Sequence, residues 1–276
     1  MAVDRSPWLR VLRPAALPRP MPIAHAFFDM DGTLSLLRQG WEQVMVPLMV
    51  EAIGGAGPAD AAIEREVREY VDRSTGLLTI EQMRWLAAAV RRHGRAPALT
   101  PAAYKARYLA RLMQPVRTRL AALASGSATP AEHMVAAAAG LLAGLQRRGV
   151  TLYLASGTDH ADVVREAQAL GLDRYFDGRI YGALDDSDAN AKDRVLARIL
   201  SEHRLAGPEL LVAGDGPVEL RHARACGALA LGVASDEVAG RGWNEHKVPR
   251  LAAAGAELLI ADYAEHEALV EMLCTA

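Results

Sequence analysis

The feature that most constrains the fold is an alternation of strand-like and helix-like segments in the C-terminal half of the chain. Short apolar runs such as VTLYLAS (150–156) and ELLVAG (209–214) alternate there with amphipathic segments such as HADVVREAQALG (160–171). Strands separated by helices pair in parallel, because the helix returns the chain to the start of the sheet. The alternation therefore predicts an α/β domain whose parallel sheet is covered by helices on both faces.

The same domain begins earlier in the chain. The apolar run IAHAFF (23–28) predicts its first, buried strand. Thr129 and Pro130 are typical of a helix start, and Gly149 is typical of a helix end. Helix patterns are predicted at 129–149, 191–203, 217–227 and 265–274, and further strands at 228–235 and 256–262.

Between the first two strands, residues 41–126 show helical periodicity only. Segments 41–53, 58–73, 79–94 and 100–113 are separated by Gly and Pro breaks. We therefore predict an all-α insert at 37–126 in an α/β core made of 23–36 and 127–276. Ligands bind at the carboxyl ends of parallel strands, so an insert that starts there is expected to lie over the site as a lid.

The stretch FFDMDGT (27–33) places Asp29 and Asp31 two positions apart, directly behind the first apolar run. Two carboxylates that lie so close together repel each other, and each disfavours ionisation of the other. A bound cation, or a proton held by one of the pair, would offset this repulsion. Asp-Gly after a strand is also a common turn signal, so the motif alone leaves an ordinary turn as an alternative.

Further polar residues follow the other predicted strands. Ser156-Gly157 ends the second strand, Lys192 stands at the start of a later helix, and GDGPVE (214–219) brings Asp215 and Glu219 after another strand. Strand ends in one sheet lie side by side, so these groups are expected to converge on Asp29 and Asp31. Taken singly, Ser156 and Asp215 could be turn residues and Lys192 a solvent-exposed side chain.

In this order the residues resemble the four motifs of the haloacid dehalogenase (HAD) superfamily of phosphohydrolases. DMDGT matches the first motif, DxDGT, letter for letter, and GDGPVE matches the fourth, GDxxxD/E. Ser156 and Lys192 match the second and third motifs. The resemblance covers about residues 23–274. It implies a Rossmann-like core, a helical C1-type cap and dependence on Mg²⁺.

The resemblance also implies residue roles. Asp29 would be the nucleophile that forms an aspartyl-phosphate, and Asp31 the general acid and base. Asp29, Asp215 and the backbone carbonyl of Asp31 would bind Mg²⁺, with Glu219 acting directly or through a water. Ser156 and Lys192 would hold phosphate oxygens. Thr33, Gly157 and Arg38 are further candidates for phosphate or substrate binding.

These expectations point to a Mg²⁺-dependent phosphatase of a small phosphorylated metabolite. In the HAD superfamily that the motifs resemble, an acid at the position of Asp31 favours phosphoryl transfer over cleavage of carbon–halogen bonds. One alternative is a phosphotransferase or phosphomutase that uses the same aspartates. Another is a non-catalytic sensor or interaction protein on the same scaffold.

Composition limits the other classes of function. The net charge of −2 gives no electrostatic case for nucleic acid or for a membrane surface. Cys226 and Cys274 make neither a metal pattern nor a disulfide framework, so a reducing cytoplasm is expected. Repeated prolines predict a loosely ordered arm at 1–22. The sequence specifies no oligomeric state.

Overall fold

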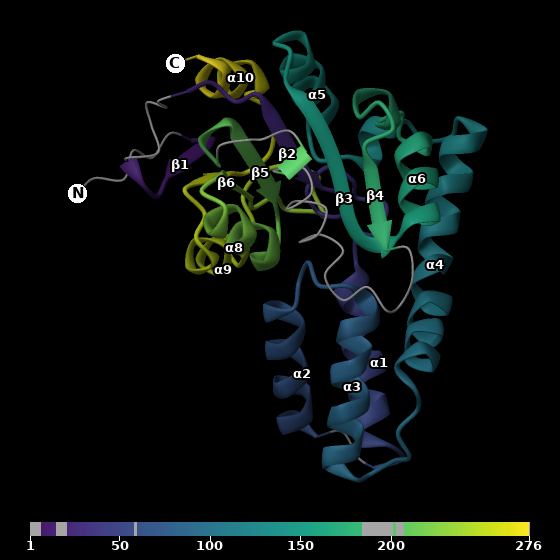
Figure 1. Cartoon of the computed structure of the whole chain (residues 1–276). Coiled ribbons are helices and arrows are strands. Elements are labelled where there is room, and N and C mark those ends of the chain that lie inside the picture. The colour runs from purple at the N-terminus through teal and green to yellow at the C-terminus, as the bar shows by residue number, and fades with distance from the viewer. Residues whose placement is uncertain (1–6, 15–20, 58–59, 184–200, 203–206, 276) are drawn as a thin grey trace.

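The computed structural model describes residues 7–14, 21–57, 60–183, 201–202 and 207–275. Within these ranges the chain forms an α/β unit around a sheet and a helical unit that projects from one end of the strands (Figure 1). The helical unit runs from Trp41 to Ser125, inside the segment expected for the insert. None of the described helices is both long enough and apolar enough to cross a bilayer.

In the described residues the sheet has seven strands in the order β1-β7-β6-β5-β2-β3-β4. All neighbouring strands pair in parallel except β1, which is antiparallel to β7. The predicted α/β fold class is therefore confirmed. The strands are β1 (Leu9–Val11), β2 (His25–Asp29), β3 (Thr151–Asp159), β4 (Ile180–Ala183), β5 (Leu210–Gly214), β6 (Leu229–Val233) and β7 (Leu258–Ile260).

Helices cover both faces of the sheet, as its apolar strands require. On one face, Phe28 of β2 belongs to an apolar cluster with α5 (Ala138–Arg147), α6 (His160–Ala169) and α10 (His266–Cys274). On the other face, Phe27 belongs to a cluster with α8 (Pro217–Ala225) and α9 (Lys247–Ala254). The two phenylalanines point to opposite faces because successive side chains of a strand alternate.

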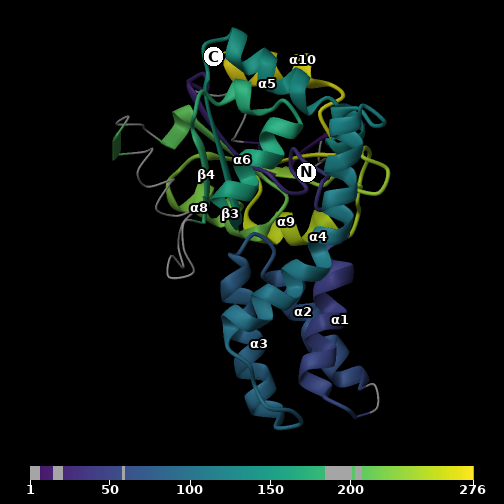
Figure 2. The same ribbon diagram turned by 90° about the vertical axis from the view of Figure 1, so that its right-hand side faces the viewer.

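The helical unit consists of α1 (Trp41–Gly54), α2 (Ala61–Arg73), α3 (Thr79–His93) and α4 (Pro101–Ser125). These helices enclose an apolar core of their own, separate from the clusters that cover the sheet. Figure 2 shows them as a bundle below the α/β unit, with the C-terminal part of α4 continuing upward alongside that unit, where Leu120 and Leu123 pack against its apolar cluster. Thr100 caps α4, since its side chain accepts a hydrogen bond from the Ala103 amide at 3.2 Å.

The expected loosely ordered arm at 1–22 is corrected in part. Residues 9–11 form strand β1, and the Trp243 indole donates to the Pro7 carbonyl at 2.9 Å. The prolines of this region stand at 7 and from 14 onward, which leaves a proline-free stretch that can pair with β7. Residues 1–6 and 15–20 lie outside the described part of the chain.

Several other boundaries differ from the sequence prediction. Strand β4 and helix α9 were not predicted, and α4 extends to Ser125. The predicted helix 129–149 is a 3₁₀ turn followed by α5, because Ala137 between them has a φ of 59°. Most of the predicted helix 191–203 lies outside the described residues. The 3₁₀ turns are Pro130–His133, Asp173–Tyr175 and Gly207–Glu209.

Candidate active site

A cavity of about 80 Å³ lies between the carboxyl ends of the central strands and the helical unit. Three carboxylates line it from the α/β unit, namely Asp29, Asp31 and Asp215. Ser156, Gly157 and Thr158 line it from the end of β3, as the sequence predicted for the first two. Arg38 and residues of α1, α3, α4 and the turn after α2 complete the wall: Trp41, Thr75, Gly76, Leu77, Thr79, Gln82, Tyr108 and Leu112.

The turn after β2 explains why glycine follows Asp31. Gly32 has a φ of 73°, in the left-handed region that glycine tolerates best. A Cβ atom at Gly32 would lie 2.4 Å from the Asp215 Oδ2 atom. Both the backbone conformation and the missing side chain are therefore needed for the first motif to approach Asp215.

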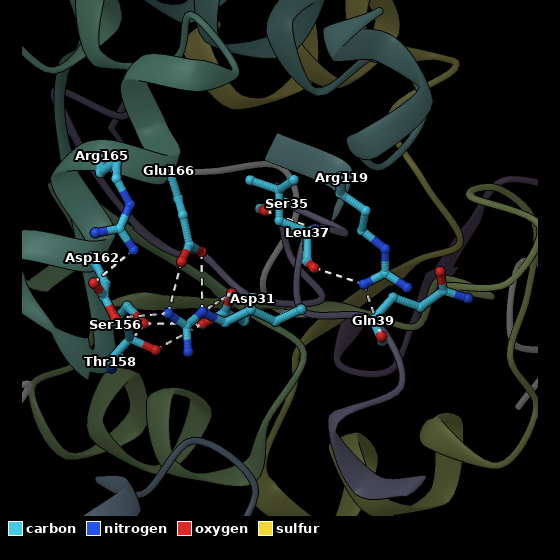
Figure 3. Close-up of polar contacts among 11 residues, drawn as sticks. Asp31, Ser35, Leu37, Gln39, Arg119, Ser156, Thr158, Asp162, Arg165 and Glu166 are labelled. Atoms are coloured by element: carbon cyan, nitrogen blue, oxygen red, sulfur yellow. Dashed lines mark hydrogen bonds and ion pairs between the residues drawn. The ribbon is translucent and has the colours of Figure 1, made fainter. Parts of the chain in front are cut away.

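Asp31 is held by the second motif. Its Oδ2 atom accepts hydrogen bonds from Ser156 Oγ at 3.1 Å and Thr158 Oγ1 at 3.3 Å (Figure 3). Its Oδ1 atom is buried, accepts no hydrogen bond from a described residue, and lies 4.0 Å from the Arg38 Nε atom. Asp31 thus keeps one oxygen anchored and the other available at the cavity.

Arg38 is bound mainly to α6 and not to the aspartates. Its Nε and Nη2 atoms donate to the two carboxylate oxygens of Glu166 at 3.0 and 2.7 Å, and Nη2 also donates to Asp162 at 3.4 Å. Burial alone would lower the pKa of the Arg38 guanidinium, but Asp31, Glu166 and Asp162 outweigh burial and raise it. Arg38 is therefore a permanent cation surrounded by carboxylates.

A buried ion-pair cluster lies on the other side of the site. The Lys247 ammonium donates to Asp215 Oδ2 at 2.8 Å and to Glu237 Oε1 at 2.7 Å. Burial would lower the pKa of Lys247, yet these two carboxylates raise it, so the side chain stays charged. Lys247 and Glu237 were missed at the sequence level. The available signal was that the chain has only three lysines, Lys105, Lys192 and Lys247.

Three predicted site residues are not placed at the cavity. Lys192 lies outside the described residues. Thr33 is fully buried and does not line the cavity. Glu219 is 2% exposed, and its carboxylate packs closely against the backbone at Gly76 and Gly216. If these glycines had a Cβ atom, it would lie 2.7 Å (Gly76) or 2.8 Å (Gly216) from that carboxylate. The roles proposed for these residues stay predictions.

The helical unit supplies the remaining wall. The turn between α2 and α3 reaches the end of β3. The approach is close: a Cβ atom added to Gly157 would lie only 3.0 Å from the Leu77 carbonyl oxygen. Tyr108 and Leu112 of α4 are also buried there. Burial is the largest cause that raises the pKa of Tyr108, so its phenol is neutral.

The donor set can be tested for a fit to Mg²⁺. Asp29 and Asp215 line one cavity, both are at most 5% exposed, and both offer the hard oxygens that Mg²⁺ prefers. Among the described side chains, no group of three or more His, Cys, Asp or Glu is arranged to hold a metal by itself. Mg²⁺ commonly binds through one or two carboxylates together with waters and substrate phosphate, so the residues present fit it.

Comparison with known proteins confirms the resemblance drawn from the motifs. A family model for haloacid dehalogenase-like hydrolases matches residues 23–227, most of the chain. No curated protein matches the sequence.

Solved structures share the fold at low identity. A predicted phosphatase from Clostridium acetobutylicum is 14% identical, with a TM-score of 0.57 over 91% of this chain and 99% of that chain. A predicted phosphoglycolate phosphatase from Haemophilus somnus is 15% identical, with a TM-score of 0.59 over 90% and 97%. A beta-phosphoglucomutase from Clostridium difficile is 13% identical, with a TM-score of 0.57 over 91% and 97%.

Proposed function

Because the chain belongs to the haloacid dehalogenase-like hydrolase family, we propose that it is a Mg²⁺-dependent phosphatase of a small phosphorylated metabolite. One observation carries the proposal: Asp29, Asp31 and Asp215 line the same cavity at the strand ends, together with Ser156. A site with a nucleophile, a proton carrier and metal-ligating oxygens has the groups that hydrolysis of a phosphate monoester needs.

In the proposed first step the Asp29 carboxylate attacks phosphorus and the bond from phosphorus to the alcohol oxygen breaks. Asp31, in its protonated form, gives its proton to that departing oxygen, and an aspartyl-phosphate remains on Asp29. In the second step Asp31 accepts a proton from water, and the water oxygen attacks phosphorus. Inorganic phosphate leaves and both carboxyl groups return to their starting forms.

Asp29 and Asp215 are the residues that would hold Mg²⁺, with the backbone carbonyl of Asp31. When bound, Mg²⁺ supplies charge neutralisation between the anionic nucleophile and the phosphate dianion. Ser156, whose hydroxyl lies 3.1 Å from Asp31 Oδ2, would exchange that hydrogen bond for one to a phosphate oxygen.

The helical unit would act as the lid. Two ion pairs among the described residues join it to the α/β unit, Lys105 Nζ to Asp159 Oδ1 at 2.7 Å and Arg250 Nη1 to Asp72 Oδ1 at 2.7 Å. Arg119 of α4 donates to the Leu37 and Gln39 carbonyls in the segment that connects the units (Figure 3). Closure over the aspartates would keep bulk water from the phosphorylated intermediate.

The direct test is phosphate release by the purified chain over a panel of phosphate monoesters, with Mg²⁺ and then with a chelator. We expect turnover of at least one small monoester, its loss in chelator and its recovery when Mg²⁺ is added back. Full activity without a divalent cation would contradict the metal part of the proposal. Turnover that appears only with a second phosphate acceptor or a bisphosphate activator would identify a phosphotransferase.

The nucleophile is tested by Asp29→Asn. We expect kcat to fall at least about 10³-fold, because an amide cannot form the acyl-phosphate that splits the reaction into two steps. A circular dichroism spectrum like the parent's would show that the fold is kept. Phosphate release at the parent rate would disprove the assignment of Asp29.

A further inference from the structure

The cavity has a charged end and an uncharged end. Its lining carboxylates, Asp29, Asp31 and Asp215, all come from the α/β unit, where the phosphate is expected. The lining residues that the helical unit contributes carry no formal charge: Trp41, Thr75, Gly76, Leu77, Thr79, Gln82, Tyr108 and Leu112. Within the described residues, Arg38 is the one cation in the lining.

Arg38 does not make the uncharged end attractive to an anion. Its guanidinium shares its positive charge with Glu166 at 2.7 Å, Asp162 at 3.4 Å and Asp31 at 4.0 Å. Asp162 is also paired with Arg165 at 2.8 Å. The positive charge of Arg38 is thus already matched by carboxylates, so Arg38 offers no unpaired cation to a carboxylate on the leaving group.

Gln82 orients a hydrogen-bond acceptor at this end. Its side chain is 4% exposed, and its Nε2 atom donates to the carbonyl and hydroxyl oxygens of Ser74 at 3.3 and 3.2 Å. With the amide nitrogen used in this way, the Oε1 atom is the part of the amide that stays available. A carbonyl oxygen accepts from a hydroxyl and repels a carboxylate.

The size of the cavity and its apolar wall further limit which leaving groups can bind. Trp41, Leu77 and Leu112 give the wall an apolar part, and the neutral Tyr108 phenol lies beside it. A cavity of about 80 Å³ has room for roughly six waters, on the scale of a phosphate with a short carbon chain.

From these observations we infer that the leaving group is a small uncharged alcohol with at least one further hydroxyl, and not a hydroxy acid. The inference rests on the proposed phosphatase function and names its substrate class. The inferred substrate differs from the substrate named for one fold neighbour, the predicted phosphoglycolate phosphatase.

The test uses two substrates of nearly equal size. 2-Hydroxyethyl phosphate and phosphoglycolate differ in one group, a neutral CH₂OH against a carboxylate. With the full chain and Mg²⁺, we expect kcat/KM for 2-hydroxyethyl phosphate to exceed that for phosphoglycolate at least about tenfold, since the lining carboxylates repel a further carboxylate. Equal values, or a preference for phosphoglycolate, would overturn the inference.

A variant tests the part assigned to Gln82. Gln82→Met should lower kcat/KM for 2-hydroxyethyl phosphate about three- to tenfold, the usual effect of one neutral hydrogen bond. It should lower kcat/KM for ethyl phosphate, which has no second hydroxyl, by a smaller factor, because only the hydrogen bonds to Ser74 are lost there. Gln43→Met, at an exposed position of α1, is the matched control and should alter neither value. A Gln82→Met effect of the same size on both substrates would contradict the acceptor role.

Binding separates this inference from the proposed function. Calorimetry with Asp29→Asn and Mg²⁺ measures affinity for the same two phosphates without turnover. Tighter binding of 2-hydroxyethyl phosphate supports the inference even if no monoester is hydrolysed by the parent, a result that would remove only the phosphatase proposal. Tighter or equal binding of phosphoglycolate overturns it.

Discussion

The α/β unit and the helical unit meet at one cavity but bring different chemistry to it. The α/β unit lines it with carboxylates at the ends of strands, whereas the helical unit lines it with apolar and neutral polar side chains. Each unit also has its own apolar core. Under the proposed function, the chemical step and the choice of leaving group would belong to different parts of the fold.

The separation has a physical origin. Carboxylates can be kept close together only where donors or cations offset their repulsion. Ser156 and Thr158 hydroxyls do this for Asp31, and the Lys247 ammonium does it for Asp215. The helical unit brings no comparable charge to the cavity, and its wall can change without disturbing that balance.

The strongest challenge to this division is Asp31→Asn set against Leu112→Ala. We expect Asp31→Asn to lower kcat by about 10²- to 10⁴-fold, the usual range for loss of a general acid and base. Leu112→Ala in the helical unit should raise KM and leave kcat within a few-fold, because it removes binding surface only. Steady-state kinetics on one substrate checks both. A larger fall in kcat for Leu112→Ala than for Asp31→Asn would break the division.

The next largest effect is expected at Lys247. Lys247→Met leaves the Asp215 and Glu237 carboxylates buried together without their shared cation, and breaking such a cluster costs about 3–5 kcal/mol in free energy of unfolding. Urea unfolding of variant and parent measures the loss. Because the variant site has gained net negative charge, Mg²⁺ should raise its melting temperature more than the parent's.

The control is Glu237→Gln, which removes one carboxylate and leaves Lys247 paired with Asp215. It should be less destabilising than Lys247→Met. If Mg²⁺ shifted the melting temperature of Lys247→Met less than that of the parent, Asp215 would not be a metal ligand.

A substitution in each apolar core shows whether the units are also separate in stability. Leu86 of α3 and Leu154 of β3 are both fully buried, and truncation to Ala at either costs about 2–5 kcal/mol. Hydrogen exchange should become faster mainly within 41–125 for Leu86→Ala and throughout the chain for Leu154→Ala. Uniform acceleration in both variants would mean that the units unfold together.

The smallest effect is expected where the units touch. Lys105→Met removes the ion pair to Asp159, whose carboxylate is 42% exposed, so its contribution to stability is at most about 1 kcal/mol. If closure of the helical unit binds substrate, KM should rise a few-fold with unchanged melting temperature. Asp72→Asn, which removes the ion pair to Arg250 from its exposed side, should behave alike. A loss in kcat without change in KM would assign these pairs to the chemical step instead.

Sequence reasoning located the groups whose positions follow from strand ends. Asp29, Ser156 and Asp215 each follow an apolar run, and the parallel sheet brings such ends together whatever their distance along the chain. The sequence could not show that Ser156 donates to Asp31, because side-chain direction at a turn depends on the neighbouring backbone.

Residues that reach the site from elsewhere were missed. Lys247 begins the unpredicted helix α9, and its position depends on how that helix packs on the sheet. Gln82 lies in a correctly predicted helix, but which of its faces meets the cavity depends on how the units dock. Strand β4 is short and its segment, IYGA, lacks the apolar alternation that marks a strand.

The three-residue strand β1 has a consequence for the handling of this protein. By pairing with β7, it occupies backbone groups that would otherwise form an open sheet border able to recruit a strand from another molecule. The Arg10 ion pair to Glu245 at 2.6 Å helps to keep it there. Truncation beyond residue 8 would therefore invite aggregation while leaving every catalytic group intact, and an affinity tag is better attached at the other terminus.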